Sequence, residues 1–236
     1  MKFPKCVIMA AGKGTRMLPL TETTPKVLVE INGKPFLYYV IENLKKAGFT
    51  EFGIIAGYLK EKIEEFVKEN GINAVIIEQK EQKGTGHAVM QAKEFTGNEN
   101  FIVLGGDNLW SADDFKTVAK DDDLIYVVGY EVEDPSKYGV FVTEGDSLVE
   151  IKEKPKKFFS NLINTALYKF TPEIYSALAK IKESPRGEYE LTDAITLLAK
   201  QGKVKVLKVK DYWLDLGSKE DIPKISEAIR SIFEEN

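Results

Sequence analysis

Short apolar segments alternate with helical segments along the first half of this chain, and this alternation limits the fold more than any other feature. Each apolar segment has the length of a buried strand, and several end in a glycine-containing loop. The expected strands comprise residues 6–11, 52–56, 73–77, 101–104 and 124–131, and the expected helices comprise residues 35–47, 59–69, 87–95 and 113–120. This order predicts a doubly wound, largely parallel sheet, with ligands bound outside the carboxyl ends of its strands.

The second half departs from that pattern because its turn chemistry predicts a hairpin. Segments 138–143 and 148–152 flank Glu144-Gly-Asp-Ser, which is typical of a tight turn between antiparallel strands. Further expected elements are strands at 164–170 and 204–209, helices at 172–182 and 190–200, and a C-terminal helix from Lys219. No repeat, low-complexity linker or composition break separates the halves. We therefore predict one domain over residues 1–236, with a soft internal division near Tyr130.

The composition excludes several classes of protein. With 43% hydrophobic and 30% charged residues, the chain has the make-up of a globular protein. Its 33 Lys and Arg against 37 Asp and Glu give a formal net charge of −4, so neither nucleic acid nor an anionic membrane is an expected partner. No apolar run approaches the roughly 18 residues of a membrane span. Cys6 is the single cysteine, which excludes an intramolecular disulfide and fits the cytoplasm.

Two loops carry features of phosphate and base binding. Gly12-Lys-Gly-Thr-Arg follows the first strand, so its backbone N–H groups can face a phosphate while Lys13 and Arg16 add positive charge. The loop fits neither the dinucleotide fingerprint nor the P-loop, and a turn with solvated side chains is the alternative. Lys26 follows a proline that fixes the local backbone. Gln79 and Gly84-Thr-Gly-His combine an amide suited to a base edge with a close-approach glycine, although a helix N-cap at Thr85 explains the second loop equally well.

Two aspartates indicate a Mg²⁺ site. Asp107 follows two glycines at the end of a buried strand, and Asp215 lies among large apolar residues, where an unpaired carboxylate is costly. Mg²⁺ takes few protein carboxylates and keeps its other positions for phosphate and water. A capping role is the alternative for Asp107. The chain has a single histidine, His87, and no Gly-x-Ser-x-Gly motif, so carboxylates and cations are left to carry the chemistry.

These motifs are similar to those of the sugar-1-phosphate nucleotidylyltransferases, also called NDP-sugar pyrophosphorylases. The resemblance is most specific at Ala10-Ala-Gly-Lys-Gly-Thr-Arg-Met-Leu-Pro-Leu-Thr with Pro25-Lys26. The other matches, in the family's order, are Gln79 with Gly84-Thr-Gly-His-Ala, Gly106-Asp107, Tyr138-Gly139-Val140, Glu153-Lys154-Pro155, Asn164-Thr-Ala-Leu-Tyr, Arg186-Gly-Glu-Tyr-Glu-Leu-Thr-Asp and Trp213-Leu-Asp215. The resemblance implies a Rossmann-like α/β fold: a mixed, mostly parallel central sheet with helices on both faces and an added antiparallel hairpin.

The resemblance also implies a reaction and a role for each matching residue. An NTP and a sugar 1-phosphate would give an NDP-sugar and pyrophosphate, with Mg²⁺ as cofactor. The implied roles are catalysis by Arg16 and Lys26; nucleotide binding by Ala10, Ala11, Gly12, Lys13, Gly14, Thr15, Gln79, Gly84 and Thr85; sugar binding by Gly139, Glu153 and Asn164; sugar-phosphate binding by Lys154 and Arg186; and metal binding by Asp107 and Asp215. Residues 1–130 would then bind nucleotide, residues 131–236 would bind the sugar phosphate, and His87 would be structural.

Several alternatives stay open at this level. UTP or dTTP with glucose 1-phosphate is favoured, but Thr21-Glu-Thr-Thr-Pro-Lys is also similar to mannose-1-phosphate guanylyltransferases. A catalytically silent regulatory subunit would lack Arg16, Lys26 or the metal aspartates, and all are present. A metal-dependent glycosyltransferase would need an Asp-x-Asp motif, whereas Asn108-Leu109 follows Asp107. No C-terminal β-helix domain is expected, and a homo-oligomer is an alternative to a monomer.

Overall fold

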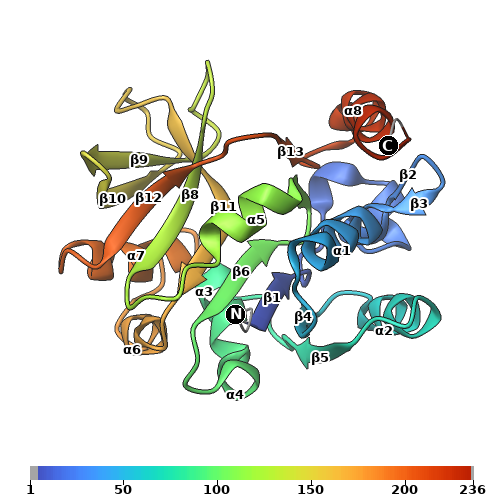
Figure 1. Cartoon of the computed structure of the whole chain (residues 1–236), viewed down its shortest axis with the longest axis horizontal. Coiled ribbons are helices and arrows are strands. Elements are labelled where there is room, and N and C mark those ends of the chain that lie inside the picture. The colour runs from blue at the N-terminus through green and yellow to red at the C-terminus, as the bar shows by residue number, and fades with distance from the viewer. Residues whose placement is uncertain (1–4, 235–236) are drawn as a thin grey trace.

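The alternating segments of the first half and the strands of the second half join in one central sheet. In this computed structural model, which describes residues 5–234, the sheet has nine strands in the order β5-β4-β1-β6-β11-β8-β12-β10-β9 (Figure 1). Its strands are β1 (Lys5–Met9), β4 (Phe52–Ala56), β5 (Ala74–Glu78), β6 (Phe101–Gly105), β8 (Ile125–Glu131), β9 (Gly139–Glu144), β10 (Ser147–Glu153), β11 (Leu162–Phe170) and β12 (Val204–Lys208). Residues 1–4 and 235–236 of the predicted domain lie outside the described range.

The strand directions confirm a mixed, mostly parallel sheet. β1 pairs in parallel with β4 and β6, β4 with β5, and β8 with β12. The predicted hairpin is present, with β9 antiparallel to β10. Another antiparallel strand, β11, lies between β6 and β8, in the middle of the sheet. The two halves of the chain are therefore hydrogen-bonded to each other through β6 and β11.

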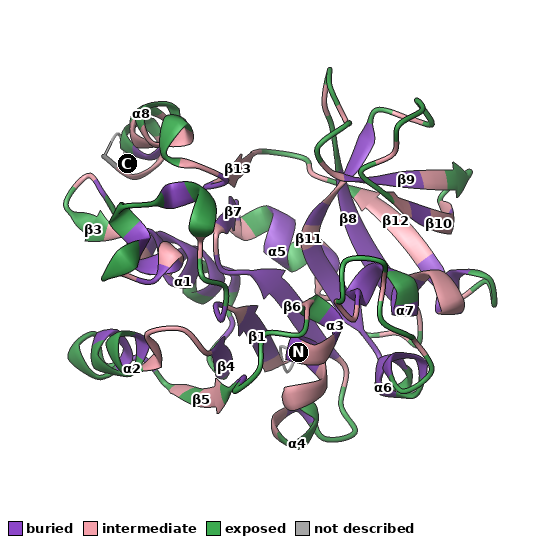
Figure 2. Cartoon of the chain, turned by 180° about the vertical axis from the view of Figure 1, so that it is seen from behind, coloured by how far each residue is buried: buried purple, intermediate pink, exposed green. Residues whose placement is uncertain are grey.

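Helices cover both faces of the sheet, as predicted. The α-helices are α1 (Phe36–Ala47), α2 (Lys60–Glu69), α3 (Thr85–Gln91), α4 (Lys93–Thr96), α5 (Ala112–Val118), α6 (Glu173–Leu178), α7 (Leu191–Ala199) and α8 (Ile222–Glu234). One buried cluster joins α1, α2, α5 and α8 to Cys6 and Ile8 of β1, and a second joins α3, α6 and α7 to Val7 of the same strand. Successive side chains of a strand point to opposite faces, so β1 contributes to both cores. Figure 2 shows the central strands buried between these layers.

Several elements differ from the sequence expectation. The expected helix at 172–182 ends at Leu178, and the expected helix at 87–95 begins earlier and divides into α3 and α4. The apolar run after Pro25 forms a 3₁₀ turn over Lys26–Leu28, followed by a small ladder of β2 (Glu30–Ile31) and β3 (Lys34–Pro35). Val27 and Leu28 are buried in that turn and Val29 is buried just after it, so apolar character alone does not distinguish this run from a strand.

A short ladder that the sequence analysis did not predict connects two distant parts of the chain. β7 (Asn108–Trp110) pairs antiparallel with β13 (Trp213–Asp215), and Asp215 lies opposite Asn108. Asn43 on α1 fixes this ladder, because its buried side-chain amide donates to the Trp110 carbonyl and to the Tyr212 hydroxyl, both at 2.7 Å. The ladder places the segment after β6 beside the segment that leads into the C-terminal helix.

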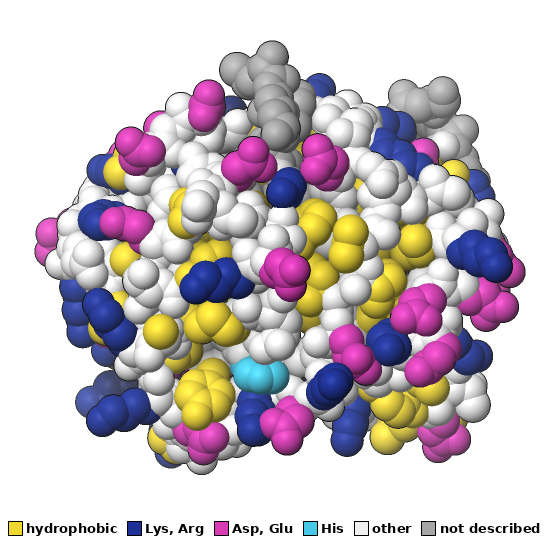
Figure 3. All heavy atoms as spheres, turned by 90° about the horizontal axis from the view of Figure 1, so that it is seen from below, with side chains coloured by type: hydrophobic (Ala, Val, Ile, Leu, Met, Phe, Trp, Pro, Cys, Tyr) yellow, Lys and Arg dark blue, Asp and Glu magenta, His cyan; other side chains and the backbone are white. Residues whose placement is uncertain are grey.

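The described residues contain no helix long and apolar enough to cross a membrane. On the face of the molecule shown in Figure 3, basic and acidic side chains are interspersed. That distribution agrees with the small net charge of the sequence and gives this face no strong preference for a polyanion.

Replacing the amide that fixes the β7/β13 ladder should destabilise the fold. We expect Asn43→Ala to lower the free energy of unfolding by about 1–3 kcal/mol, because the buried Trp110 carbonyl and the half-buried Tyr212 hydroxyl both lose this donor. Asn70→Ala is the control, since Asn70 donates to the Phe66 carbonyl at an exposed helix end and should cost less. Urea titration followed by circular dichroism measures both variants, and equal losses would contradict the interpretation.

Candidate active site

The glycine loop after β1 forms one wall of a pocket. Gly14 adopts φ = 63°, and a Cβ atom there would lie 2.9 Å from the Lys26 Cβ. Glycine is therefore required at this position, both for the left-handed backbone and for contact with the lysine. The Thr21 hydroxyl donates to the Gly14 carbonyl at 2.8 Å, which fixes the loop. These contacts bring Lys13 and Lys26 to one cavity.

The expected base-side loop forms the opposite wall. Gln79 is buried at the end of β5, and its Nε2 lies 3.3 Å from the Gly84 carbonyl oxygen and 3.0 Å from His87 Nδ1. His87 also lies 3.3 Å from the Gln91 amide nitrogen. The histidine therefore orients Gln79, which is the structural role expected for it. Gln82 donates to the Ala11 carbonyl at 2.7 Å and links the two loops.

A segment of the second half, residues 184–190, is hydrogen-bonded along the base-side loop. The Tyr189 N–H donates to the Lys83 carbonyl and the Gly86 N–H donates to the Tyr189 carbonyl, both at 2.8 Å. A Cβ atom on Gly84 would lie 2.7 Å from the Tyr189 carbonyl oxygen, so only glycine permits this approach. The second half thus closes the pocket that the first half builds.

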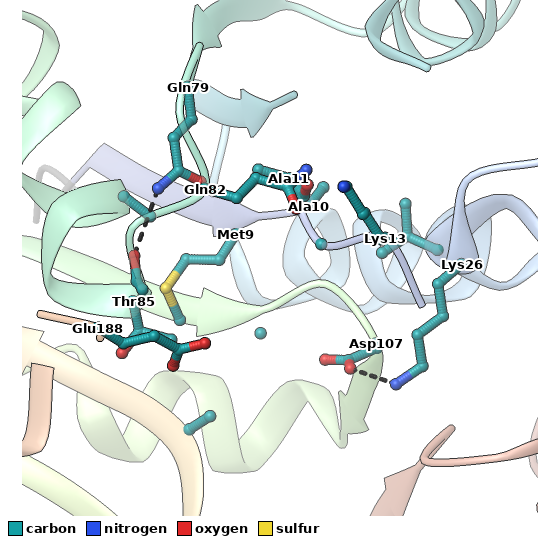
Figure 4. A pocket seen from close by; sticks show the side chains of 16 residues that line it. Met9, Ala10, Ala11, Lys13, Lys26, Gln79, Gln82, Thr85, Asp107 and Glu188 are labelled. Atoms are coloured by element: carbon teal, nitrogen blue, oxygen red, sulfur yellow. Dashed lines mark hydrogen bonds and ion pairs between the residues drawn. The ribbon is translucent and has the colours of Figure 1, made fainter. Parts of the chain in front are cut away.

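These walls enclose a cavity of about 420 Å³, within the range of small-molecule sites. It is lined by Met9, Ala10, Ala11, Gly12, Lys13, Lys26, Val27, Gln79, Gln82, Gly84, Thr85, Ala88, Gly105, Asp107, Ala166 and Glu188. Figure 4 shows Lys13, Lys26 and Asp107 at one end and Gln79, Thr85 and Glu188 at the other. Cations are therefore concentrated at one end of the cavity, where a polyphosphate would be most stable.

The cationic end is held by an ion pair. Lys26 Nζ lies 2.7 Å from Asp107 Oδ2, and both side chains are largely shielded from solvent. Asp107 Oδ1 accepts a hydrogen bond of 2.9 Å from Asn108 Nδ2, which fixes the carboxylate plane. Arg16 is exposed at the end of the glycine loop, near enough to affect the pKa of Asp215.

The β7/β13 ladder places Asp215 beside Asp107. The Leu216 N–H donates to the Asp107 carbonyl at 2.9 Å. Loss of hydration first, and repulsion from Asp107 second, raise the pKa of Asp215 to about 6, although Lys26 and Arg16 act in the opposite direction. Two carboxylates that repel each other in this way form a donor set suited to a divalent cation.

Mg²⁺ fits this pair of residues. No group of three or more His, Cys, Asp or Glu side chains within residues 5–234 is placed to hold a metal ion, but Mg²⁺ needs only one or two protein carboxylates when phosphate and water fill its other positions. A Cβ atom on Gly217 would lie 3.3 Å from Asp215 Oδ2 and 3.2 Å from Asp221 Oδ2, so the glycine leaves room for two carboxylates. Asp221 already has a partner, because its Oδ2 accepts a hydrogen bond of 2.7 Å from the Ser218 N–H in a helix cap.

The expected sugar-binding residues lie at the ends of β9, β10 and β11. Gly139 pairs with Glu153, and a Cβ atom on the glycine would lie 3.1 Å from Glu153 Oε1. Glu153 is exposed but stands in a hollow, where partial loss of hydration raises its pKa. Asn164 lies at a bulge of β11, and its amide is held by the Tyr168 hydroxyl at 2.7 Å and the Ala166 N–H at 3.1 Å.

Arg186 lies apart from the cavity that holds the glycine loops. Its guanidinium pairs with Glu190 at 2.8 Å, and both residues line a second hollow of about 650 Å³ together with Glu153. Lys154 has a left-handed backbone, with φ = 42°, and its N–H donates to the Tyr138 carbonyl. Most of the residues expected to bind nucleotide line one cavity with Lys26 and Asp107, whereas Gly14, Thr15, Arg16 and Asp215 do not line it, and Arg186 is engaged elsewhere.

Sequence reasoning missed several residues that line the cavity. Met9 and Gly105 end the neighbouring strands β1 and β6, Ala166 lies at the bulge within β11, and Gln82 and Glu188 come from loops. The strand ends carried a usable signal, because ligands bind at the carboxyl ends of parallel strands. Glu188 carried none, because an acidic residue between two helices is typical of a solvated loop.

Comparison with known proteins identifies close relatives. Residues 5–232 match the model of the nucleotidyl transferase family. The bifunctional protein GlmU of Methanocaldococcus jannaschii is 40% identical over 240 residues, which cover 98% of this chain and 57% of that protein. The UTP–glucose-1-phosphate uridylyltransferase AglF of Haloferax volcanii is 36% identical over 92% of this chain and 93% of its own length. The chain therefore spans little more than half the length of its GlmU relative.

A solved structure agrees with the sequence relatives. UDP-glucose pyrophosphorylase complexed with UDP-glucose superposes with a TM-score of 0.87 and 30% identity, covering 98% of this chain and 100% of that one. The chain belongs to the nucleotidyl transferase family, which confirms the resemblance to sugar-1-phosphate nucleotidylyltransferases inferred from its motifs.

Proposed function

We propose that this protein transfers a nucleotidyl group from an NTP to a sugar 1-phosphate, giving an NDP-sugar and pyrophosphate. The observation that carries the proposal is the cavity with Lys13, Lys26 and Asp107 at one end and the base-side residues Gln79 and Thr85 at the other (Figure 4). Such a cavity suits a nucleotide whose phosphates lie at the cationic end. AglF, which is similar over nearly its whole length, is named for the same reaction class.

The chemistry needs positioning and charge neutralisation more than proton transfer. An oxygen of the sugar phosphate attacks the α-phosphorus in line, the new P–O bond forms, and the bond to the bridging oxygen breaks as pyrophosphate leaves. The attacking phosphate is already anionic, so no general base is required. Lys26 and Arg16 offset the repulsion between the two anions and stabilise the developing charge. Mg²⁺ held by Asp107 and Asp215 would supply a further positive charge at the phosphates.

The second half of the chain is proposed to bind the sugar phosphate. Gly139, Glu153 and Asn164 are our candidates for the sugar hydroxyls, and their place at the ends of adjacent strands supports that assignment. Lys154 and Arg186 are the candidates for the phosphate. To bind the phosphate, Arg186 must first break its ion pair with Glu190.

UTP or dTTP is our proposed nucleotide and glucose 1-phosphate our proposed sugar. The name of AglF and the bound UDP-glucose of the solved relative support UTP and glucose. A mannose-1-phosphate guanylyltransferase remains the alternative that the segment before Lys26 suggests. A silent subunit is disfavoured, because Arg16, Lys26, Asp107 and Asp215 are all present in the sequence. We also propose a cytoplasmic location, which the single cysteine, Cys6, supports because one cysteine cannot form an intramolecular disulfide.

Pyrophosphate release from the purified chain tests the proposal. We expect release with Mg²⁺ from one pairing among UTP, dTTP, GTP, CTP and ATP with glucose, N-acetylglucosamine, galactose and mannose 1-phosphates. Addition of EDTA should abolish it, because without the divalent cation the two carboxylates only add negative charge beside the phosphates. Coupled pyrophosphatase and phosphate detection measures the rate. Nucleotide binding without release from any pair would instead support the silent subunit.

Removing either proposed metal carboxylate should stop the reaction without unfolding the chain. We expect Asp107→Asn and Asp215→Asn each to lower turnover by roughly two orders of magnitude or more, because phosphate alignment is lost. Asp113→Asn is the matched control, since Asp113 is exposed on α5 and pairs only with Lys116. Near-normal turnover in one of the two site variants would remove that aspartate from the metal role.

Arg16 should act on the transition state more than on sugar binding. We expect Arg16→Ala to lower kcat by roughly tenfold to a thousandfold and to change the KM of the sugar 1-phosphate little, because a preorganised cation is lost. Steady-state kinetics with both substrates varied measures the two parameters. Arg230→Ala, on the exposed side of α8, is the control. A change confined to the KM of the sugar 1-phosphate would contradict the assignment.

A further inference from the structure

The Glu188 carboxyl group belongs to the cavity of the proposed nucleotide site, although the residue comes from the second half of the chain. Glu188 lines that cavity beside Gly84 and Thr85. Figure 4 shows its carboxylate among the labelled side chains at the end away from Lys13 and Lys26. The motif analysis assigned no role to this residue. Its place therefore raises the question of what an acidic group does in a pocket for a polyanion.

The backbone holds Glu188 firmly against the base-side loop. Its neighbour Tyr189 exchanges two backbone hydrogen bonds of 2.8 Å with Lys83 and Gly86. A Cβ atom on Gly84 would lie 2.9 Å from the Glu188 Cβ, so these two backbones are as close as glycine permits. The Thr85 hydroxyl adds a further link, because it accepts from the Leu191 N–H at 3.1 Å. Glu188 is thus preorganised rather than free to swing away with a mobile loop.

Glu190, the next acidic residue after Glu188, already has strong partners. Arg186, the nearest cation on the same segment, gives its hydrogen bond to Glu190 at 2.8 Å, and Ser184 donates to the same carboxylate at 2.9 Å. Arg186 interacts with Glu188 only through the longer-range field. No hydrogen bond or ion pair to the Glu188 carboxylate occurs among residues 5–234 that would satisfy its oxygens. A carboxylate can only accept hydrogen bonds, so a ligand beside it must present donors.

The charges of the cavity fix which end of a nucleotide lies at Glu188. The carboxylate repels phosphates, whereas Lys13 and Lys26 at the opposite end attract them. The nucleoside is the part that remains, and it carries the needed donors as N–H groups of the base and O–H groups of the ribose. Glu188 therefore makes one end of the cavity negative while the lysines make the other end positive. It also offers a hydrogen-bond acceptor to the uncharged end of the ligand.

We propose that Glu188 is a specificity-determining residue that accepts a hydrogen bond from the nucleoside of the NTP, from a base N–H or a ribose O–H. This inference rests on the proposed function, because it assumes that the cavity takes a nucleotide. It assigns part of nucleotide recognition to the second half of the chain. A hydrogen bond to a charged acceptor in a partly desolvated site corresponds to a change of about tenfold to a hundredfold in affinity.

The test compares Glu188→Ala and Glu188→Gln with the natural chain. We expect Glu188→Ala to lower kcat/KM for the NTP by about tenfold to a hundredfold and to leave the KM of the sugar 1-phosphate unchanged. Glu188→Gln should recover part of the loss, because its amide oxygen still accepts. UTP and 2′-deoxy-UTP distinguish the two donor sources. A ribose contact gives a preference for UTP that Glu188→Ala abolishes, whereas a base contact leaves that ratio unchanged and alters the ratio of UTP to CTP.

A matched control and a binding measurement complete the design. Glu227→Gln changes an exposed acid on α8 that lines neither the nucleotide cavity nor the second hollow, so it should behave as the natural chain does. An unchanged kcat/KM for the NTP in Glu188→Ala, or a loss confined to the KM of the sugar 1-phosphate, would overturn the inference. Calorimetric titration with UTP keeps the two proposals separate. If the natural chain binds UTP without turnover, the proposed function fails, while weaker binding by Glu188→Ala still supports the role of Glu188.

Discussion

The pairing of β7 with β13 is the contact on which the candidate site depends. It joins two three-residue strands that are about a hundred positions apart in the chain, and it places Asp215 opposite Asn108. Without this ladder, Asp107 would have no second carboxylate of the proposed metal site beside it. The ladder is short, so its position depends on surrounding contacts: Asn43 bonds to both of its sides, and Trp213 Nε1 donates to Asn108 Oδ1 at 2.8 Å. A geometry of this kind is fixed by tertiary contacts rather than by strand propensity.

The same principle applies at the opposite end of the cavity. Residues 184–190 have no regular secondary structure, yet backbone hydrogen bonds pin them to the loop that precedes α3. The consequence is that neither half of the chain forms the cavity alone. The first half supplies the cationic end and the floor, while the second half supplies a wall that contains Glu188 and leads directly into α7. The antiparallel strand β11 makes this possible, because it joins the two halves within one sheet.

The sequence was informative where neighbouring residues determine the structure, or where a whole strand is buried. β4 and β6 are buried along their whole length, and such strands appear in a sequence as continuous apolar runs. The glycine loop after β1 was also predictable, because its position follows from the strand before it. The Lys26–Leu28 turn was not, since a buried run of Val27, Leu28 and the following Val29 fits a strand and a 3₁₀ turn equally well.

The β7/β13 ladder had no usable signal in the sequence. Three residues are too few to show a period, and pairing across a hundred positions cannot be derived from local propensity. The sequence analysis nevertheless placed Asp107 and Asp215 in one metal site, because it expected a buried carboxylate to need a partner. Glu188 shows the converse: its chemistry was visible in the sequence, but its place in the cavity depends on backbone contacts that no local pattern indicates.

The arrangement of charges explains how such a site could exist before its substrate binds. Lys26 and Asp107 neutralise each other at 2.7 Å, and burial together with repulsion from Asp107 raises the pKa of Asp215 to about 6, because these effects outweigh the attraction of Lys26 and Arg16. Under the proposed function, Lys26 exchanges Asp107 for a phosphate, and Asp107 joins Asp215 in holding the divalent cation. Each charge that loses a partner gains another in the same step. Breaking the ion pair between Lys26 and Asp107 costs free energy, and under the proposed function the new contacts with the phosphate and the cation offset that cost.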